Sequence, residues 1–292
     1  MLTSRTVMKK RHYQEYDVEQ TYDKDISKAS EEEIAKLLRT GKLKCAYVTK
    51  TITSGKVKEV EIYPVYTSCQ LKKHKEIRRI SSKSRRNLND KNSRKYLNRL
   101  INCNFGDDDI WATLTYDNEH LPRTEDEAMK KFQYYIRKIN KYRAKKGIGK
   151  AKYIYITEKS SGKKRFHHHM IIDHELTMDE IEKLWPYGRR NNTRKIHEDK
   201  EGLNGLASYL TKEKDREKGK KRWNCSKGLK KPTVTKSYTK LSMKKIRDMT
   251  ANQNMIRETI EKLYPGTIYC EERALFNQFN SRTYFYIRLA IP

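Results

Sequence analysis

The apolar positions of this 292-residue chain are most regular in its centre, between residues 110 and 212. Alternating or continuous apolar runs predict strands there, and a three- or four-residue period predicts helices. The expected elements follow the order strand, helix, strand, strand, helix, strand, helix, over residues 110–116, 125–146, 153–157, 166–173, 177–185, 194–196 and 203–212. This order predicts an α+β fold in which a ferredoxin-like antiparallel sheet packs on helices.

The flanks of this centre show weaker patterns. Residues 1–30 have no period, which is typical of a tail, and residues 70–101 are basic and helix-permissive. The other expected elements are a short helix opened by a capping box at Ser30 and Glu33, a hairpin over 44–52 and 57–66, a helix over about 242–263, and strands over 268–274 and 283–290. We therefore expect a basic N-terminal extension, a central domain and a C-terminal extension, over residues 1–100, 101–235 and 236–292.

Composition adds a strong positive charge to this picture. The chain has 66 Lys and Arg residues against 37 Asp and Glu residues, a formal net charge of +29. The charge is concentrated in residues 71–99, 137–152 and 212–247. Separate blocks of one sign favour binding to a polyphosphate, and the 20 tyrosines supply rings that pack in a core or stack on bases. Nucleic acid is therefore the expected partner.

Several classes of protein do not fit the sequence. No apolar run approaches the roughly 18 residues of a membrane-spanning helix, so we expect no membrane partner. The N-terminus lacks the apolar core of a signal peptide, which predicts a protein of the cytosol. The 5 cysteines are scattered without CxxC spacing, which argues against a disulfide framework and a zinc ribbon.

Three consecutive histidines lie in one of the central strands. Side chains alternate along a strand, so His167 and His169 share a face and His168 points to the other. Glu158 ends the preceding strand, and a glycine-containing turn can bring it beside them. Two imidazoles and a carboxylate leave coordination positions open and accept Mn²⁺, Mg²⁺ or Zn²⁺. The pairs His167/His168 and His168/His169 remain alternative ligand sets, and a histidine cluster without function is an equal alternative for this motif alone.

A tyrosine and a lysine follow on the last central helix. Tyr209 and Lys212 are three residues apart and so project from one helical face. A tyrosine hydroxyl, with its usual pKa near 10, is a weak nucleophile. It becomes useful where a metal polarises a phosphodiester and a cation stabilises the charge that develops. Taken alone, this pair is more typical of a core tyrosine followed by a solvated lysine.

Taken in order, these motifs resemble those of the HUH endonucleases. The series Ala112-Thr113-Leu114-Thr115-Tyr116, Glu158, His167-His168-His169-Met170-Ile171-Ile172 and Tyr209-Leu210-Thr211-Lys212 is similar to single-tyrosine rolling-circle replication initiators of phages, plasmids and integrative elements. Residues 185–188 and 222–232 resemble further blocks of that group, and the resemblance covers about residues 100–235. One departure is that the residue between the paired histidines is usually a bulky hydrophobic, and here it is His168.

The resemblance implies an α+β HUH endonuclease fold and an enzyme that nicks and rejoins one strand of origin DNA. Tyr209 would attack the scissile phosphate and form a 5′-phosphotyrosine, and the freed 3′-hydroxyl would prime replication. Glu158, His167 and His169 would hold Mn²⁺ or Mg²⁺, and Lys212 would assist charge or proton handling. The side chains expected to contact DNA are Lys163, Lys164, Arg165, Arg222, Trp223, Lys227, Lys230 and Lys231. No GxxxxGK[ST] motif occurs, so a host helicase and polymerase are the expected further partners.

Three alternatives remain at this stage. Mobilisation relaxases and single-strand transposases belong to the same superfamily, but relaxases commonly place the nucleophile before the histidines and the transposases are usually shorter. A non-haem iron oxygenase also uses two histidines and a carboxylate, although its usual HxD spacing is missing here. A non-catalytic nucleic-acid-binding protein would explain the charge and leave both motifs incidental.

Overall fold

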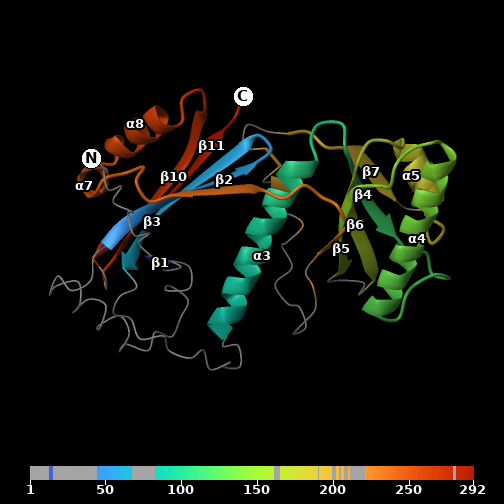
Figure 1. The fold of residues 1–292 in the computed structure, drawn as a ribbon. Coiled ribbons are helices and arrows are strands. Elements are labelled where there is room, and N and C mark those ends of the chain that lie inside the picture. The colour runs from blue at the N-terminus through green and yellow to red at the C-terminus, as the bar shows by residue number, and fades with distance from the viewer. Residues whose placement is uncertain are drawn as a thin grey trace, which may run out of the picture. The chain divides into compact units, whose positions relative to one another are not determined.

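The computed structural model describes residues 13–15, 45–67, 83–160, 165–189, 191–198, 202–203, 205–206, 210, 221, 223–278 and 281–292 (Figure 1). The chain divides into two compact units. The central unit comprises the described parts of residues 54–57 and 92–233. The flanking unit comprises the described parts of residues 1–53, 58–91 and 234–292.

A five-stranded antiparallel sheet forms the frame of the central unit. Its strands are β4 (Ile110–Thr115), β5 (Tyr153–Lys159), β6 (Phe166–Ile172), β7 (Asn192–Lys195) and β8 (Asn224–Cys225). They lie in the order β7-β4-β6-β5-β8, and each neighbouring pair is antiparallel. Helix α4 (Glu125–Lys145) connects β4 to β5, and α5 (Met178–Leu184) connects β6 to β7. This is the split βαββαβ arrangement of ferredoxin-like folds, which confirms the predicted α+β class.

The two connecting helices begin where their capping residues require. The Thr124 side chain accepts from the Glu127 N–H at the start of α4, and Thr177 and Glu180 form a complete capping box at the start of α5. Phe132 and Ile139 of α4 are fully buried, as the period of the sequence predicts.

The two faces of this sheet are covered by different elements. On one face, alternate side chains such as Leu114, Tyr155 and Met170 pack against α4 and α5, which lie together in Figure 1. On the other face, Trp111, Ile154, Ile156 and Ile171 pack against a second set of residues. That set includes Leu97, Leu100 and Ile101 of α3 (Lys83–Asn104) together with Leu203, Leu206 and Leu210. We call the first the α4 face and the second the α3 face.

The flanking unit contains a second, six-stranded sheet. Its strands are β1 (Tyr13–Glu15), β2 (Cys45–Ser54), β3 (Val57–Thr67), β9 (Thr233–Ser237), β10 (Ile268–Asn277) and β11 (Arg282–Ala290). The order is β10-β11-β3-β2-β9, and β1 pairs with β3. Helices α7 (Met243–Ala251) and α8 (Asn254–Leu263) bury Ile246, Ile256 and Ile260 in one core with side chains of β3 and β11.

Most expectations for the flanks are confirmed, and two are corrected. The hairpin is β2–β3, and the two C-terminal strands are β10 and β11. The helix expected over 242–263 is two helices, because Asn252 is extended and its side chain accepts from the Asn254 N–H, in competition with helical bonding. Residues 13–15, expected in a tail, form β1 because they pair with the end of β3. The short helix expected after Ser30 lies outside the described residues.

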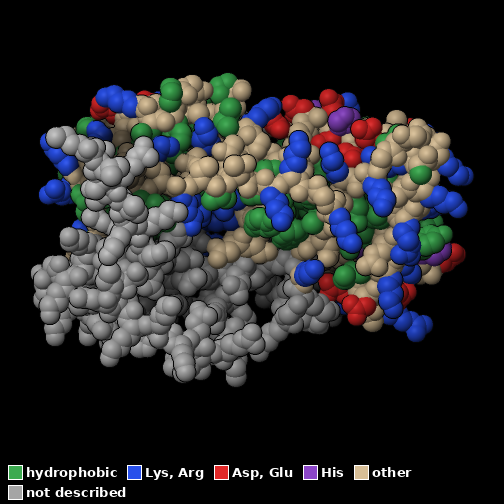
Figure 2. All heavy atoms as spheres, in the orientation of Figure 1, with side chains coloured by type: hydrophobic (Ala, Val, Ile, Leu, Met, Phe, Trp, Pro, Cys, Tyr) green, Lys and Arg blue, Asp and Glu red, His purple; other side chains and the backbone are tan. Residues whose placement is uncertain are grey.

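No helix in the described part of the chain is both long enough and apolar enough to cross a membrane. Figure 2 shows Lys and Arg side chains spread over the described surface, with acidic side chains between them.

Candidate active site

Strand β6 sends its three histidines to opposite faces of the central sheet. His167 is paired with Thr115 of β4 and Glu158 of β5, and His169 is paired with Thr113 and Ile156. His167 and His169 therefore point to the α3 face, together with Ile171. His168 points to the α4 face.

Glu158, His167 and His169 form a compact group. The Nε2 atoms of His167 and His169 lie 3.7 and 3.6 Å from Glu158 Oε2, and the three potential ligand atoms all lie within 4.8 Å of one another. Among the described residues, this is the group of His, Cys, Asp and Glu side chains with metal-site geometry. The side chains of His167 and Glu158 are 20% and 18% exposed, so the group is reached from solvent. Two imidazole nitrogens and one carboxylate fit a divalent metal with open coordination positions.

His169 is oriented by residues of the neighbouring strand. Thr113 Oγ1 lies 3.1 Å from its Nδ1, and the indole N–H of Trp111 donates to the same oxygen at 3.3 Å. The Trp111 ring also stacks on the imidazole, with 5.2 Å between centroids and 27° between planes. When Nδ1 carries the ring proton and donates it to Thr113, the Nε2 lone pair faces Glu158 and is free to bind a metal.

Burial keeps the imidazole of His169 neutral. Desolvation lowers the pKa of His169 to about 4, the nearby His167 contributes in the same direction, and Glu158 opposes both. A neutral imidazole is the form that ligates a metal, so near pH 7 this side chain needs to lose no proton before it binds an ion.

His168 is a fully buried residue with both ring nitrogens bonded. Its Nε2 lies 2.6 Å from the Tyr116 hydroxyl and its Nδ1 lies 3.0 Å from Thr157 Oγ1. Desolvation lowers the pKa of His168 to about 3, with smaller contributions from His167 and His169. Because it lies across the sheet from Glu158, a pair that includes His168 does not complete a ligand set with that carboxylate.

Several residues expected to act on DNA lie outside the described part of the chain. They are Tyr209, Lys212, Lys163, Lys164 and Arg222. The chain on both sides of Tyr209 is described: Gly205, Leu206 and Leu210 are helical, and Leu210 is 1% exposed. Leu206 and Leu210 pack in the cluster on the α3 face, the face that carries Glu158, His167 and His169.

The described residues among the expected DNA contacts differ in their surroundings. Arg165 donates to Asn118 Oδ1 and to the Tyr116 carbonyl, and so lies at the same end of β4 and β6 as His167. Trp223 donates its indole N–H to Ser93 Oγ and packs beside Tyr96. Lys227, Lys230 and Lys231 are exposed.

The sequence did not single out the residues that support the histidines. Trp111 and Thr113 alternate with Ala112 and Leu114, so their common face with His169 could have been inferred once the pairing of β4 with β6 was known. Tyr116 and Thr157, which bond His168, carried no recognisable signal.

Comparisons with known proteins give one match. Residues 109–214 match the family model of the replication-associated protein ORF2. Searches of curated proteins and of solved structures give no match. The matched segment contains Glu158, His167, His169 and Tyr209, and it is similar over this range to replication-associated proteins.

Proposed function

We propose that this protein initiates replication by nicking one strand of origin DNA and later rejoining it, with a divalent metal and a tyrosine nucleophile. The match of residues 109–214 to a replication-associated family supports the role in replication. The observation that carries the proposed chemistry is the Glu158–His167–His169 group, which lies on one sheet face within that segment.

The proposed reaction is a phosphoryl transfer to Tyr209. A divalent Mn²⁺ or Mg²⁺ ion held by Glu158, His167 and His169 supplies positive charge to the scissile phosphate. The Tyr209 oxygen forms a bond to phosphorus as its hydroxyl proton is lost, and the bond from phosphorus to the 3′-oxygen breaks. The 3′-oxygen takes up a proton and becomes the primer end, and Lys212 assists with charge or proton transfer. Attack of a DNA 3′-hydroxyl on the phosphotyrosine reverses these steps and rejoins a strand.

The residues that flank Tyr209 support its place in this reaction. Leu206 and Leu210 are one helical turn apart and pack on the α3 face. In a continuous helix, residue 209 is three positions after Leu206 and next to Leu210, so it borders the side of the helix that meets this face. This is the face on which the proposed metal ligands lie.

The charge of the chain supports single-stranded origin DNA as the substrate, and we propose a host helicase and polymerase as partners in the cytosol. Residues 101–235 would form the nuclease, and residues 1–100 and 236–292 would be accessory. The exposed Lys227, Lys230 and Lys231, with Arg165, Trp223, Lys163, Lys164 and Arg222, are the proposed DNA contacts. Because such contacts release counterions, binding should weaken steeply as salt is raised.

A denaturing gel tests the proposal directly. The full chain is incubated with Mn²⁺ and a labelled pool of single-stranded oligonucleotides with a randomised centre. We expect a covalent protein–DNA adduct that EDTA and Tyr209→Phe abolish. Tyr134→Phe is the matched control, because Tyr134 is 50% exposed on α4 and lies on the other face of the sheet. An adduct that persists in Tyr209→Phe, or a wild-type protein that forms none, would contradict the proposal.

A further inference from the structure

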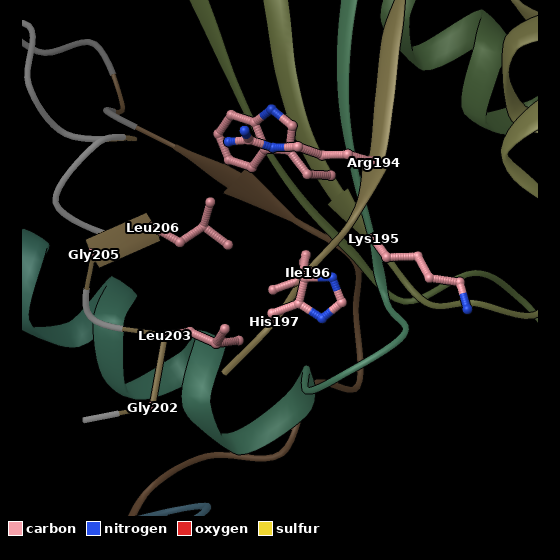
Figure 3. A pocket seen from close by; sticks show the side chains of 9 residues that line it. Arg194, Lys195, Ile196, His197, Gly202, Leu203, Gly205 and Leu206 are labelled. Atoms are coloured by element: carbon pink, nitrogen blue, oxygen red, sulfur yellow. The ribbon is translucent and has the colours of Figure 1, made fainter. Parts of the chain in front are cut away.

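A pocket of about 260 Å³ lies on the α3 face of the central unit (Figure 3). It is lined by Trp111 of β4, by residues 194–197 at the end of β7, and by Gly202, Leu203, Gly205 and Leu206. The proposed reaction assigns no role to this pocket. Its volume lies just below the roughly 300–1,000 Å³ of sites for drug-sized ligands, so it suits one planar ring system.

The lining of the pocket is apolar inside and cationic at the rim. Ile196 and Leu203 are 5% and 3% exposed, and in Figure 3 the side chains of Leu203 and Leu206 face Ile196. Arg194 is exposed, and its guanidinium carbon lies 5.9 Å from the centre of the Trp111 ring. Lys195 points away and pairs with Asp108 at 2.6 Å, so Arg194 supplies the cation beside the aromatic wall.

This combination matches the chemistry of an unpaired nucleotide. A nucleobase is a flat, uncharged ring that packs against aromatic and aliphatic side chains, and its phosphate requires a cation at the surface. Arginine suits such a rim because its guanidinium both stacks on rings and pairs with phosphate. An acidic ligand is not favoured inside the pocket, because the described inner wall carries no cation.

The pocket adjoins the proposed metal ligands. The same Trp111 ring that forms its wall stacks on His169, and the indole N–H of Trp111 bonds to Thr113, the partner of His169. At its other side, Leu206 lies three residues before Tyr209 in the chain. A base held in the pocket is therefore separated from the metal ligands by one aromatic ring.

We propose that this pocket holds one unpaired nucleobase of the DNA strand and thereby selects which phosphodiester bond reaches Glu158, His167 and His169. The selection of the bond rests on the proposed function, whereas the binding of a base does not require cleavage. No bond forms or breaks in the pocket, so Trp111, Arg194 and the leucines are positioning residues.

Gly205 offers a way to fill the pocket without disturbing its walls. A Cβ added at Gly205 meets no heavy atom within 4 Å, and its backbone does not have the positive φ that restricts substitution. Gly205→Leu should therefore place a side chain in the pocket, with Gly205→Ala as a smaller step. Gly149→Leu is the matched control, because a Cβ there also meets open space and the residue does not line the pocket.

The first measurement is binding in EDTA, so that cleavage plays no part. Fluorescence anisotropy compares a thymidine 12-mer with a 12-mer of abasic sugar-phosphate that has the same charge. We expect Gly205→Leu to weaken binding of the thymidine strand about 10-fold, the effect of one lost stacked base, with an intermediate effect of Gly205→Ala. Affinity for the abasic strand should not change, and Gly149→Leu should match the wild type on both strands.

Equal losses on both strands, or no loss on either, would overturn the pocket proposal, since misfolding or altered charge affects both strands alike. The second measurement sequences the ends that wild type and Gly205→Leu produce from the randomised pool with Mn²⁺. Relaxed base preference at one position beside the cut supports selection, and an unchanged preference overturns it. A wild type that prefers bases yet forms no adduct contradicts the nuclease and the selection of the bond, but leaves base binding standing.

Discussion

Two faces of one strand treat the same side chain in opposite ways. On the α4 face, His168 is fully buried, and each of its ring nitrogens has a hydroxyl partner. On the α3 face, His167 and His169 direct their Nε2 atoms toward the Glu158 carboxylate. All three belong to β6, and the alternation of the strand alone separates them.

The difference shows what makes a histidine available to a metal. An imidazole whose two nitrogens are bonded inside a core has no lone pair left to offer, and its burial excludes the charged form. The packing of His168 against Phe132 and Trp185 also fixes the strand that carries the two ligands. A rigid strand holds ligands in place more accurately than a loop does. The bulky hydrophobic that the family usually has at this position would meet the same requirement.

The largest expected effect comes from removing a ligand on the α3 face. His169→Ala should lower Mn²⁺ affinity by at least about 100-fold, beyond the roughly 10–100-fold that outer-shell changes cost. Isothermal titration calorimetry measures this directly. His174→Ala is the control, because His174 is largely exposed and pairs with Asp109, outside the proposed ligand group. Equal Mn²⁺ affinity of the two variants would remove the basis for the metal site.

The second prediction concerns the α4 face. His168→Ala should lower the free energy of unfolding by about 3 kcal/mol, because it leaves a cavity and two buried hydroxyls without their partner. Urea denaturation measures this loss, and folded His168→Ala should bind Mn²⁺ within a few-fold of the wild type. The comparison breaks if this variant loses the metal while its stability is unchanged.

The sequence predicted this comparison in part. Strand alternation was sufficient to place His167 and His169 together and His168 apart, since a pattern with a period of two needs no knowledge of partners. The partners themselves are 11 and 52 residues away from His168 along the chain, and only the pairing of β5 and β4 with β6 brings Thr157 and Tyr116 to it.

Other features depended on contacts that a single sequence does not encode locally. The C-terminal strands were expected, but β11 joins β3 of the N-terminal hairpin, so one sheet is assembled from the two ends of the chain. The proposed base pocket likewise needs Trp111, the end of β7 and residues 202–206 at one place. The break at Asn252 came from a side chain that competes for a backbone N–H, which the apolar period does not report.

The third prediction is a pH dependence that separates the two faces. The pKa of His168 falls from its usual 6.5 to about 3 on folding, so between these values the unfolded chain binds more protons than the folded one. Stability is therefore lost as pH falls through this window. Between pH 7 and pH 5, His168 should account for about 2 kcal/mol of that loss. His168→Phe should show a correspondingly shallower decline in urea denaturation, and equal slopes would mean that burial does not keep His168 neutral.

The smallest expected effect lies one bond away from the metal ligands. Thr113→Val keeps the shape of the side chain but removes the oxygen that His169 Nδ1 and the Trp111 indole N–H both contact. The His169 ring then loses the partner that orients it, and Mn²⁺ affinity should fall about 10-fold, as for other outer-shell residues. Thr193→Val is the control: Thr193 also bonds through its hydroxyl, but to Glu182 rather than to a proposed ligand. If both variants bind Mn²⁺ like the wild type, Thr113 does not orient His169, and the α3 face holds its ligands by packing alone.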